Sequence, residues 1–376
     1  MTIPNVKAML EVVFDILEVL RFLRMHRNVL HRDISKGNVV YVNRPQNGTA
    51  EVRDTRAREC KQPPVFARYF LGESDDPHET SALLIDFDNA EVLESKTDGE
   101  GGSRIGTAVF MSRAVDLGRA VTFSPWLRPP TPRSPDPYAE TYPERLEKFK
   151  PEDEERPMSR FFFESSKDSD RRVWGHELDH DVESVFWLMF YWALSARPKE
   201  RQNELINCGT WSCLIGGAGW RQALIRGFSA NPDRKGAVHS AFQPLMDLIS
   251  KLARILQLDR HWLDNSHPLN DPEYIVEAFQ RLVLQFILDN RDEVFMGIEV
   301  DRQPRDVEEI PGVYLRSTAN QRANFENEKK RTRPKVDDDN SNERGPLEAG
   351  QNHIEEDEAL SDVDDTVDDT EENWQR

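Results

Sequence analysis

Eight residues near the N-terminus have the types and spacing that phosphoryl transfer needs. Residues 31–38 read HRDISKGN and fit the pattern H-R-D-x-x-x-x-N. In this chemistry the aspartate, Asp33, accepts the proton of the attacking hydroxyl, and the asparagine five positions later, Asn38, holds a magnesium ion. On the motif alone, an aspartate that caps a turn beside a surface histidine remains an alternative.

A second acidic residue follows an apolar run that is typical of a short strand. The run at residues 83–87 contains Asp86, followed by Phe87 and Asp88. Mg²⁺ prefers hard oxygen ligands and usually takes one or two carboxylates together with substrate phosphates. Asp86 and Asn38 are therefore candidate magnesium ligands, and a strand-end carboxylate in a turn is the alternative for Asp86.

Two further motifs follow in a fixed order. Residues 106–112 read GTAVFMS, which resembles the G-T-x-x-[YF]-M sequence that closes the activation segment of protein kinases. Residues 180–190 read HDVESVFWLMF and predict the start of an apolar helix. In protein kinases an aspartate at this helix start, here Asp181, hydrogen-bonds the backbone of the catalytic loop.

Together these motifs resemble the fungal-type protein kinase family over about residues 5–300. The points of resemblance are HRDISKGNVV, LLIDFDNA, GTAVFMS and HDVESVFWLMF. The resemblance implies an α+β, mainly α, protein-kinase-like C-terminal lobe that uses ATP and Mg²⁺ and phosphorylates serine or threonine of protein substrates. It also implies that Asp33 is the catalytic base and that Asn38 and Asp86 are the metal ligands.

The kinase N-terminal lobe has no counterpart in this sequence. Only 32 residues precede Asp33, and they hold no G-x-G-x-x-G; their one lysine, Lys7, lacks a V-A-I-K context. Because turnover requires the ATP-positioning Lys–Glu pair as well as the metal-bound Asp, we expect an incomplete ATP site and impaired transfer, or a truncated sequence.

The sequence departs from the protein kinase pattern at three further places, all near the candidate site. Lys36 lies three residues after Asp33, where serine/threonine kinases carry their lysine two residues after; it is a candidate contact for the transferred phosphate or a solvated loop lysine. The acidic residue expected to anchor the activation segment is replaced by Arg113-Ala114. Asp88 removes the backbone freedom of a glycine at the third position of D-F-G.

The apolar pattern predicts the elements that must position these residues. Helical periodicity appears in four segments, and β-like runs appear in two. The helices are expected at 5–30, 177–196, 237–258 and 273–290, and the strands at 39–42 and 83–87. Two long insertions, at about 44–80 and 124–157, are expected to be irregular, the first because it is rich in charge and the second because it holds nine prolines.

Charge separates a folded body, residues 1–316, from a tail at 317–376 that we expect to be disordered. Residues 337–376 carry 16 acidic against two basic side chains, out of a net charge of -19 for the whole chain. Ahead of them, Lys329–Lys335 holds five basic residues and fits a nuclear-import signal or a solvated basic patch. Glu11, Asp15 and Glu18 interrupt the N-terminal apolar stretch where a secretory signal needs an uncharged core, so we expect an intracellular protein, cytoplasmic or nuclear.

Composition also argues against several classes of protein. The acidic balance argues against a protein whose whole surface binds nucleic acid, although it leaves a local basic patch open. The longest apolar run, Val185–Leu194, is too short to cross a membrane. Three cysteines without a CxxC pair support neither a disulfide framework nor a zinc site. The sequence does not indicate an oligomeric state.

Two other functions stay open beside the protein kinase. The missing lobe favours a catalytically inactive interaction module that binds a protein partner. A small-molecule kinase uses a similar H-x-D-x-x-x-x-N motif, but it has no need of the peptide-substrate segment that residues 106–112 resemble. We also expect Arg32 to pair with a phosphate if Ser95, Thr97 or Ser103 is phosphorylated.

Overall fold

The computed structural model describes residues 2–42, 63–93, 105–121, 127–157, 175–231, 236–257 and 268–308. The chain divides into two compact units, Met1–Val313 and Tyr314–Arg376, and all described residues lie in the first. The predicted tail, its boundary at residue 316 and the basic cluster Lys329–Lys335 therefore lie outside the described residues.

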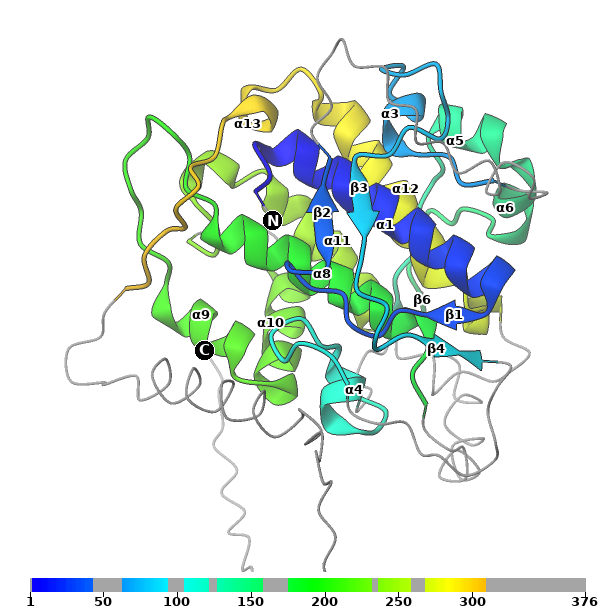
Figure 1. The fold of residues 1–376 in the computed structure, drawn as a ribbon, viewed down its shortest axis with the longest axis horizontal. Helices are drawn as coiled ribbons and strands as arrows, with labels where there is room; N and C mark the ends of the chain where they lie inside the picture. The colour runs from blue at the N-terminus through cyan, green and yellow to red at the C-terminus, as the bar shows by residue number, and fades with distance from the viewer. Residues whose placement is uncertain are drawn as a thin grey trace, which may run out of the picture. The chain divides into compact units, whose positions relative to one another are not determined.

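The described part is mainly helical, as the resemblance implies, with small antiparallel sheets only (Figure 1). Its α-helices are α1 Val6–Arg27, α3 Ala67–Phe70, α4 Arg113–Leu117, α5 Asp136–Thr141, α6 Pro143–Lys148, α8 Leu178–Ser195, α9 Cys208–Ile215, α10 Ala218–Ala230, α11 Leu245–Leu256, α12 Tyr274–Asn290 and α13 Val294–Gly297. Short 3₁₀ turns cover Ser240–Phe242 and Pro268–Asn270. The strands are β1 Val29–Leu30, β2 Val39–Tyr41, β3 Ala82–Leu84, β4 Glu91–Val92, β5 Leu127–Arg128 and β6 Arg156–Pro157.

Helix α1 begins and ends at asparagines with opposite roles. The side chain of Asn5 accepts a hydrogen bond from the Ala8 backbone N–H at 2.9 Å, which caps the first turn. Asn28 adopts the left-handed conformation, with a φ of 52°, and the helix ends there rather than at residue 30, the predicted end. The turn at Asn28 directs the chain into β1 and then into the HRDISKGN loop.

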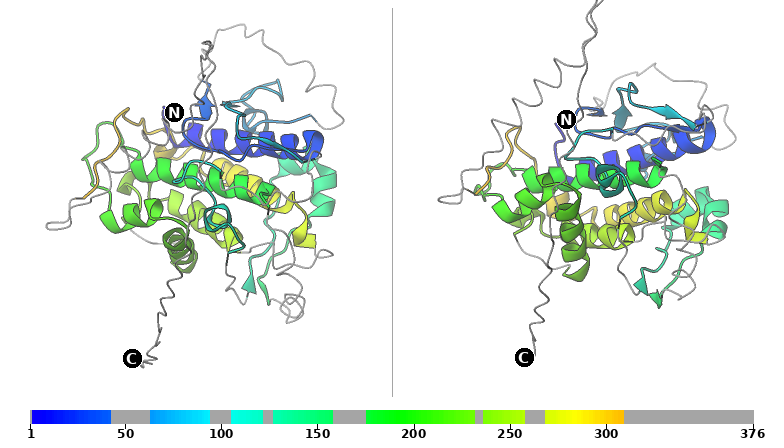
Figure 2. Two further views of the ribbon diagram at one scale, coloured as in Figure 1. Left: turned by 60° about the horizontal axis from the view of Figure 1, so that its bottom comes forward. Right: turned by 90° about the horizontal axis from the view of Figure 1, so that it is seen from below.

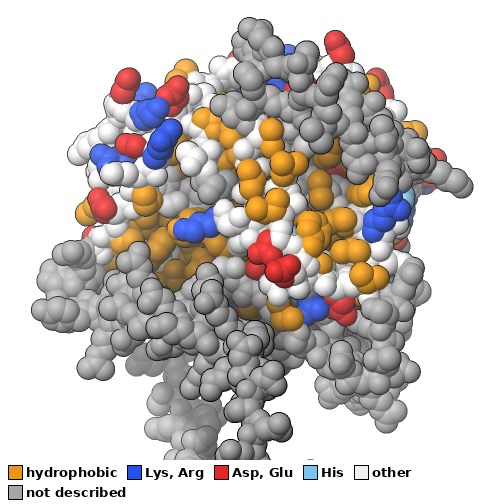
Figure 3. Space-filling model, in the orientation of Figure 1, with side chains coloured by type: hydrophobic (Ala, Val, Ile, Leu, Met, Phe, Trp, Pro, Cys, Tyr) orange, Lys and Arg blue, Asp and Glu red, His pale blue; other side chains and the backbone are white. Residues whose placement is uncertain are grey.

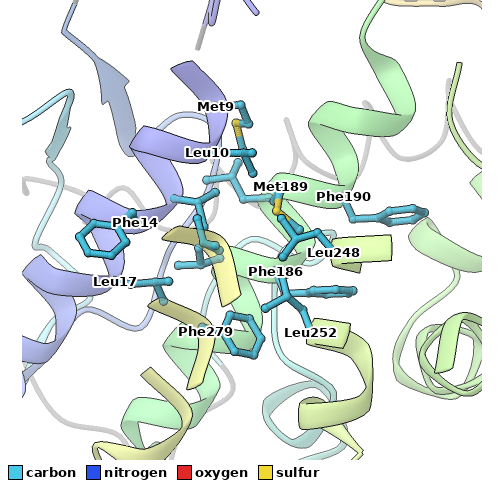
Figure 4. Packing of buried hydrophobic residues seen from close by; sticks show 14 of the residues in the cluster. Met9, Leu10, Phe14, Leu17, Phe186, Met189, Phe190, Leu248, Leu252 and Phe279 are labelled. Atoms are coloured by element: carbon cyan, nitrogen blue, oxygen red, sulfur yellow. The ribbon is translucent and has the colours of Figure 1, made fainter. Parts of the chain in front are cut away.

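The hydrophobic core lies where α1 meets α8 and α12 (Figure 2). In Figure 4 Met9, Leu10 and Leu17 of α1 point toward α8, α11 and α12. The Phe14 ring points away from them and packs against Phe70 and Tyr138. The labelled members are Met9, Leu10, Phe14, Leu17, Phe186, Met189, Phe190, Leu248, Leu252 and Phe279, and all are buried. This core fixes α1 against α8, and those two helices flank the loop that carries the candidate catalytic residues.

The two predicted strand runs pair with each other. β2 and β3 form an antiparallel hairpin in which Val39 faces Leu84, on the outer side of α1 (Figure 2). β1 pairs with β4 in the same sense, with Leu30 facing Glu91, and this second ladder did not follow from the sequence pattern. Residues 31–38 and residues 85–90 each run from one ladder to the other. The two ladders therefore hold the loop that carries Asp33 close to the segment that carries Asp86.

The second half of the first insertion packs on α1 through a buried carboxylate. Asp15 is fully buried and accepts hydrogen bonds from the Ala67 N–H at 2.9 Å, the Ser81 N–H at 2.6 Å and the Thr80 hydroxyl at 3.1 Å. Burial, opposed in part by these donors, raises the pKa of Asp15 to about 7. Residues 63–81 are therefore part of the folded body rather than a wholly irregular loop.

The prediction that residues 124–157 hold no regular element is wrong. Helices α5 and α6 lie in this segment, and each carries its proline, Pro137 or Pro143, within the first two helical positions. The missing proline N–H costs nothing there, because the first-turn N–H groups have no intrahelical partner. Counting prolines without regard to helix position produced the error.

A buried ion network attaches α5 and α6 to α1. Glu18 pairs with Arg21 at 2.6 Å and with Arg145 at 3.1 Å, and all three side chains are buried. Burial alone would raise the pKa of Glu18, but the two guanidinium groups outweigh it and hold the pKa well below its usual range. The paired charges thus make the second insertion a packed part of the domain.

Among the helices that the structure describes, none combines the length and the apolar character that a membrane span requires.

Candidate active site

The loop that carries Asp33 is held in shape by one buried carboxylate from α8. Asp181 accepts a hydrogen bond from the His31 N–H at 2.9 Å and another from the Arg32 N–H at 3.0 Å. Its side chain is fully buried and also lies 3.0 Å from Nε2 of His176. The contact between Asp181 and the loop backbone, which the kinase resemblance implied, is confirmed.

The first turn of α8 presents Asp181 to the loop. Glu177 and His180 form reciprocal side-chain-to-backbone bonds that cap this helix, so its start is fixed. Asp181 stands one position after His180, in the turn where negative charge is favoured by the helix dipole. The apolar stripe that follows anchors the helix in the core, and the position of Asp181 is therefore rigid.

The carboxylate of Asp33 is surrounded by four hydrogen-bond donors. Oδ1 accepts from the Thr107 backbone N–H at 2.9 Å and from its hydroxyl at 2.8 Å. Oδ2 accepts from the side-chain amides of Asn38 at 3.1 Å and Asn89 at 3.3 Å. A carboxylate offers about four lone-pair sites, so an incoming hydroxyl would take the place of one donor, and Asn89 makes the longest of these contacts.

Gly106 lets the 105–112 segment approach the catalytic loop. It has a φ of 129°, and a Cβ placed there would lie 3.0 Å from the Arg32 carbonyl oxygen. Any other residue would have to move away from the loop and adopt an unfavourable backbone conformation. The glycine is thus the reason that the adjacent Thr107 reaches Asp33.

The two candidate metal ligands lie at the same end of the β2–β3 hairpin. The Asn38 carbonyl oxygen accepts the Ile85 N–H at 2.9 Å, which places Asn38 beside the residue before Asp86. The amide nitrogen of Asn38 donates to the Asp33 carbonyl oxygen at 2.8 Å, so its amide oxygen is the atom left for a cation. Asp86 is exposed and has a φ of 65°, a left-handed conformation that turns its side chain out of the strand direction.

This donor set fits a magnesium ion that is shared with a phosphate. Within the described residues, no group of three or more His, Cys, Asp or Glu side chains is placed to hold a metal alone. One carboxylate and one amide oxygen are a typical protein share for Mg²⁺, which completes its shell with water and substrate oxygens. Asp88, by contrast, does not have a positive φ; it lies in a turn closed by the Ala90 N–H on the Phe87 carbonyl, so no glycine is required there.

Lys36 extends from the same loop toward α8. Its Nζ lies 3.4 Å from the Tyr191 hydroxyl and 5.2 Å from the centre of the Tyr191 ring. The side chain is exposed, which suits contact with a charged group that arrives from solvent. The structure thus brings Asp33 and Asn38 into contact, places Asp86 next to Ile85, which is hydrogen-bonded to Asn38, and leaves Lys36 exposed on the same loop.

The segment that follows residues 105–112 has an anchor that the sequence did not reveal. Arg113 stands near the position expected for an acid, yet it is buried and donates from Nε to Glu183 of α8 at 2.9 Å. Burial would raise the pKa of Glu183, but Arg113 lowers it below its usual value. This ion pair ties the segment to α8, and the long sequence separation of its partners hid it from sequence motifs.

A second buried arginine clamps the same segment from α10. Arg221 is fully buried and donates to the carbonyl oxygens of Ala108 at 2.9 Å and Met111 at 2.5 Å. Its Nη2 also donates to Asp116 at 2.9 Å. These contacts fix residues 108–116 beside the catalytic loop.

An apolar surface adjoins the candidate metal ligands. Figure 3 shows hydrophobic side chains gathered on the face that carries β2 and β3. Its members from these strands and their flanks are between 39% and 50% exposed, a high value for large apolar side chains: Val40, Leu83, Ile85, Phe87 and Val92. The Phe87 ring also contacts the buried His31 ring, with centroids 4.8 Å apart, so this surface is continuous with the catalytic loop.

Comparison with known proteins gives one match. The family model described as fungal protein kinase matches residues 1–193, slightly more than half of the 376 residues. No curated protein and no solved structure gives a significant match. The matched region contains α1, the catalytic loop, Asp86, the 105–112 segment and most of α8.

Proposed function

Since the chain belongs to the fungal protein kinase family, we propose that it transfers the γ-phosphoryl group of ATP to a serine or threonine of a protein substrate. The observation that carries the proposal is the Asp33 carboxylate, which Thr107, Asn38 and Asn89 hold between the catalytic loop and the 105–112 segment. A carboxylate in this position can accept the proton of a substrate hydroxyl.

The geometry at Asp33 suggests how a hydroxyl would enter. Thr107 and Asn38 reach Asp33 from structured elements, whereas the Asn89 contact is the longest, at 3.3 Å. A substrate hydroxyl that displaces the Asn89 amide would donate to Oδ2 and pass its proton to that oxygen as phosphoryl transfer proceeds. Thr107 and Asn38 would keep the carboxylate oriented during this exchange.

Asn38 and Asp86 would hold Mg²⁺ through one amide oxygen and one carboxylate. When bound, the ion supplies positive charge that neutralises the phosphate oxygens of ATP. The exposed Val40 and Ile85 lie beside these ligands and offer an apolar surface for the purine ring. Lys36, which is exposed on the same loop as Asn38, would contact the transferred phosphate in place of its present contact with Tyr191.

The test is a phosphorylation assay on the purified chain with Mg-ATP and a protein substrate mixture, read as ³²P on serine and threonine. Asp33→Asn should abolish the signal, and Asp86→Asn should lower it and raise the Mg²⁺ requirement. Asp247→Asn, which changes an exposed carboxylate on α11, is the control and should behave as wild type. Because we also propose that these 376 residues turn over slowly, the assay needs high enzyme concentration and long incubation.

Equal signals from wild type and Asp33→Asn, or none from either, would refute phosphoryl transfer by this chain.

A second candidate is a non-catalytic module that binds a protein partner. The exposed apolar surface on β2 and β3 favours it, because such surfaces often mark protein interaction sites. Thermal unfolding with and without Mg-ATP separates the two candidates, since a ligand that binds the native state raises the apparent stability. A rise that Asp86→Asn removes would support the kinase, and no rise would support the binding module.

A further inference from the structure

Arg32 is held at two points beside the candidate base. Its backbone has a φ of 70°, a left-handed conformation that is uncommon for a residue with a side chain. The N–H of Arg32 donates to Asp181, and its Nη1 donates to Oε2 of Glu91 at 2.9 Å. The direction of the Arg32 side chain is therefore determined by α8 at one end and by β4 at the other.

Glu91 approaches Arg32 from a paired strand rather than from a loop. It lies on β4 opposite Leu30 of β1, the strand that leads into the catalytic loop. The Leu93 N–H donates to the Asn28 carbonyl at 2.8 Å and extends this ladder. Glu91 therefore has a fixed place relative to Arg32.

The pair is partly withdrawn from water, since the side chains of Arg32 and Glu91 are 10% and 23% exposed. A charge-assisted hydrogen bond in such a site is stronger and less screened by salt than a surface ion pair.

In many kinases the segment after the metal-binding Asp is ordered when an added phosphate pairs with arginine. Here a carboxylate encoded in the chain already pairs with Nη1 of the Arg32 guanidinium. We infer that Glu91 is a positioning residue that replaces an activating phosphate, so the catalytic loop reaches its working arrangement without phosphorylation of residues 94–104. This inference rests on the proposed function and concerns the regulation of the same site.

The inference changes the expectation for Ser95, Thr97 and Ser103, which lie outside the described residues. A phosphate there carries a charge of about -2 and would have to share the Arg32 guanidinium with Glu91, which already accepts from Nη1. Glu91 and the phosphate would then repel each other across the same guanidinium. Phosphorylation is therefore not expected to increase activity.

The experiment uses the full chain, treated with phosphatase and verified by intact mass. Glu91→Gln removes the charge and keeps the side-chain size, and Glu91→Asp keeps the charge. The matched control is Glu79→Gln, because Glu79 forms a similar partly buried pair with Arg68 at 2.8 Å away from the catalytic loop. Two quantities are measured: turnover with Mg-ATP, and hydrogen–deuterium exchange of peptides that cover residues 29–38 and 105–112.

We expect phosphatase treatment to leave wild-type turnover within about twofold. Glu91→Gln should lower turnover and speed exchange at residues 29–38 by about tenfold, consistent with loss of one charge-assisted hydrogen bond. Glu91→Asp should recover part of both effects, and Glu79→Gln should show neither in these peptides.

Three results would overturn the inference. They are a large loss of wild-type activity on phosphatase treatment, unchanged exchange in Glu91→Gln, and the same effect from the uncharged glutamine and the charged aspartate. If no form of the protein turns over but exchange at residues 29–38 responds as expected, the proposed function fails while the positioning role of Glu91 stands.

Discussion

Replacing Asp181 with asparagine tests how the catalytic loop is held. Asp181 is fully buried and accepts two backbone hydrogen bonds, from His31 and Arg32. An asparagine has the same shape but only one side-chain acceptor, so its amide nitrogen must face one of these N–H groups. The variant keeps one hydrogen bond, loses the charge and leaves one buried donor without a partner.

The size of the effect follows from these contacts. A hydrogen bond to a charged group contributes about 1.5–3 kcal/mol, and an unsatisfied buried donor costs about 1–3 kcal/mol. Because the remaining bond survives in weaker form, we expect Asp181→Asn to lower the free energy of unfolding by about 2–4 kcal/mol. That is less than the about 5–15 kcal/mol of a typical domain, so the variant should still fold.

Asp179 provides a matched control. It lies in the same first turn of α8, so Asp179→Asn removes the same charge from the helix start, an effect of about 0.3–1 kcal/mol. The difference between the two variants therefore reports the buried contacts of Asp181, which are the hydrogen bonds to the loop and the contact with His176. Urea denaturation measures the free energies, and hydrogen exchange at His31 and Arg32 should accelerate by about 30-fold for a 2 kcal/mol loss. Equal destabilisation by the two variants, with unchanged exchange at His31 and Arg32, would refute this reasoning.

Three further predictions follow from the same contacts. Gly106→Ala should lower the free energy of unfolding by about 1–3 kcal/mol and displace Thr107 from Asp33, because the new Cβ would lie 3.0 Å from the Arg32 carbonyl oxygen. Gly219→Ala, at a helical position with open space, should instead raise the free energy of unfolding measured by denaturation. Arg221→Met should lower the free energy of unfolding by about 3–5 kcal/mol and make residues 105–112 sensitive to limited proteolysis. Arg119 is exposed, so Arg119→Met should cause neither change. Equal cleavage of the two variants would contradict the role given to Arg221. Burial raises the pKa of Asp15 to about 7, so the native state binds more protons than the unfolded chain from about pH 4 to 7; stability from this group should fall as pH rises, by about 1 kcal/mol per pH unit. Denaturation at pH 5 to 8 should show that Asp15→Asn removes this slope, and a variant that keeps the wild-type slope would contradict the assignment.

Sequence reasoning succeeded where short motifs or apolar periodicity carry the information. The existence of strands near residues 39–42 and 83–87 and the contact of Asp181 with the backbone of the HRDISKGN loop agree with the structure. Helices α1, α8 and α12 begin and end within about three residues of the predicted limits. In these segments local propensity and tertiary packing favour the same conformation.

It failed where a side chain meets a partner far along the chain. Arg221 reaches the carbonyl oxygens of residues 108 and 111, and Arg113 reaches Glu183, contacts that no local pattern encodes. The donors Thr107 and Asn89 on Asp33 were missed for the same reason. Helices α5 and α6 were missed because prolines were counted without regard to their position in the first turn.

The contacts that shape the catalytic loop separate its geometry from nucleotide binding. Asp181 and Arg32 fix the backbone from the α8 side, and Thr107 and Asn38 orient Asp33. Asp181 and Arg32 lie on the side of the loop that contacts α8, and the buried Asn38 serves both Asp33 and the candidate metal site. Asp86 and the apolar surface, by contrast, are exposed on the β2–β3 side. A variant of the exposed side should therefore lose nucleotide binding without altering hydrogen exchange in residues 29–38. Conversely, Asp181→Asn should alter that exchange even when no nucleotide is present. The two kinds of variant thus distinguish a kinase that lacks its nucleotide from a loop that has lost its shape.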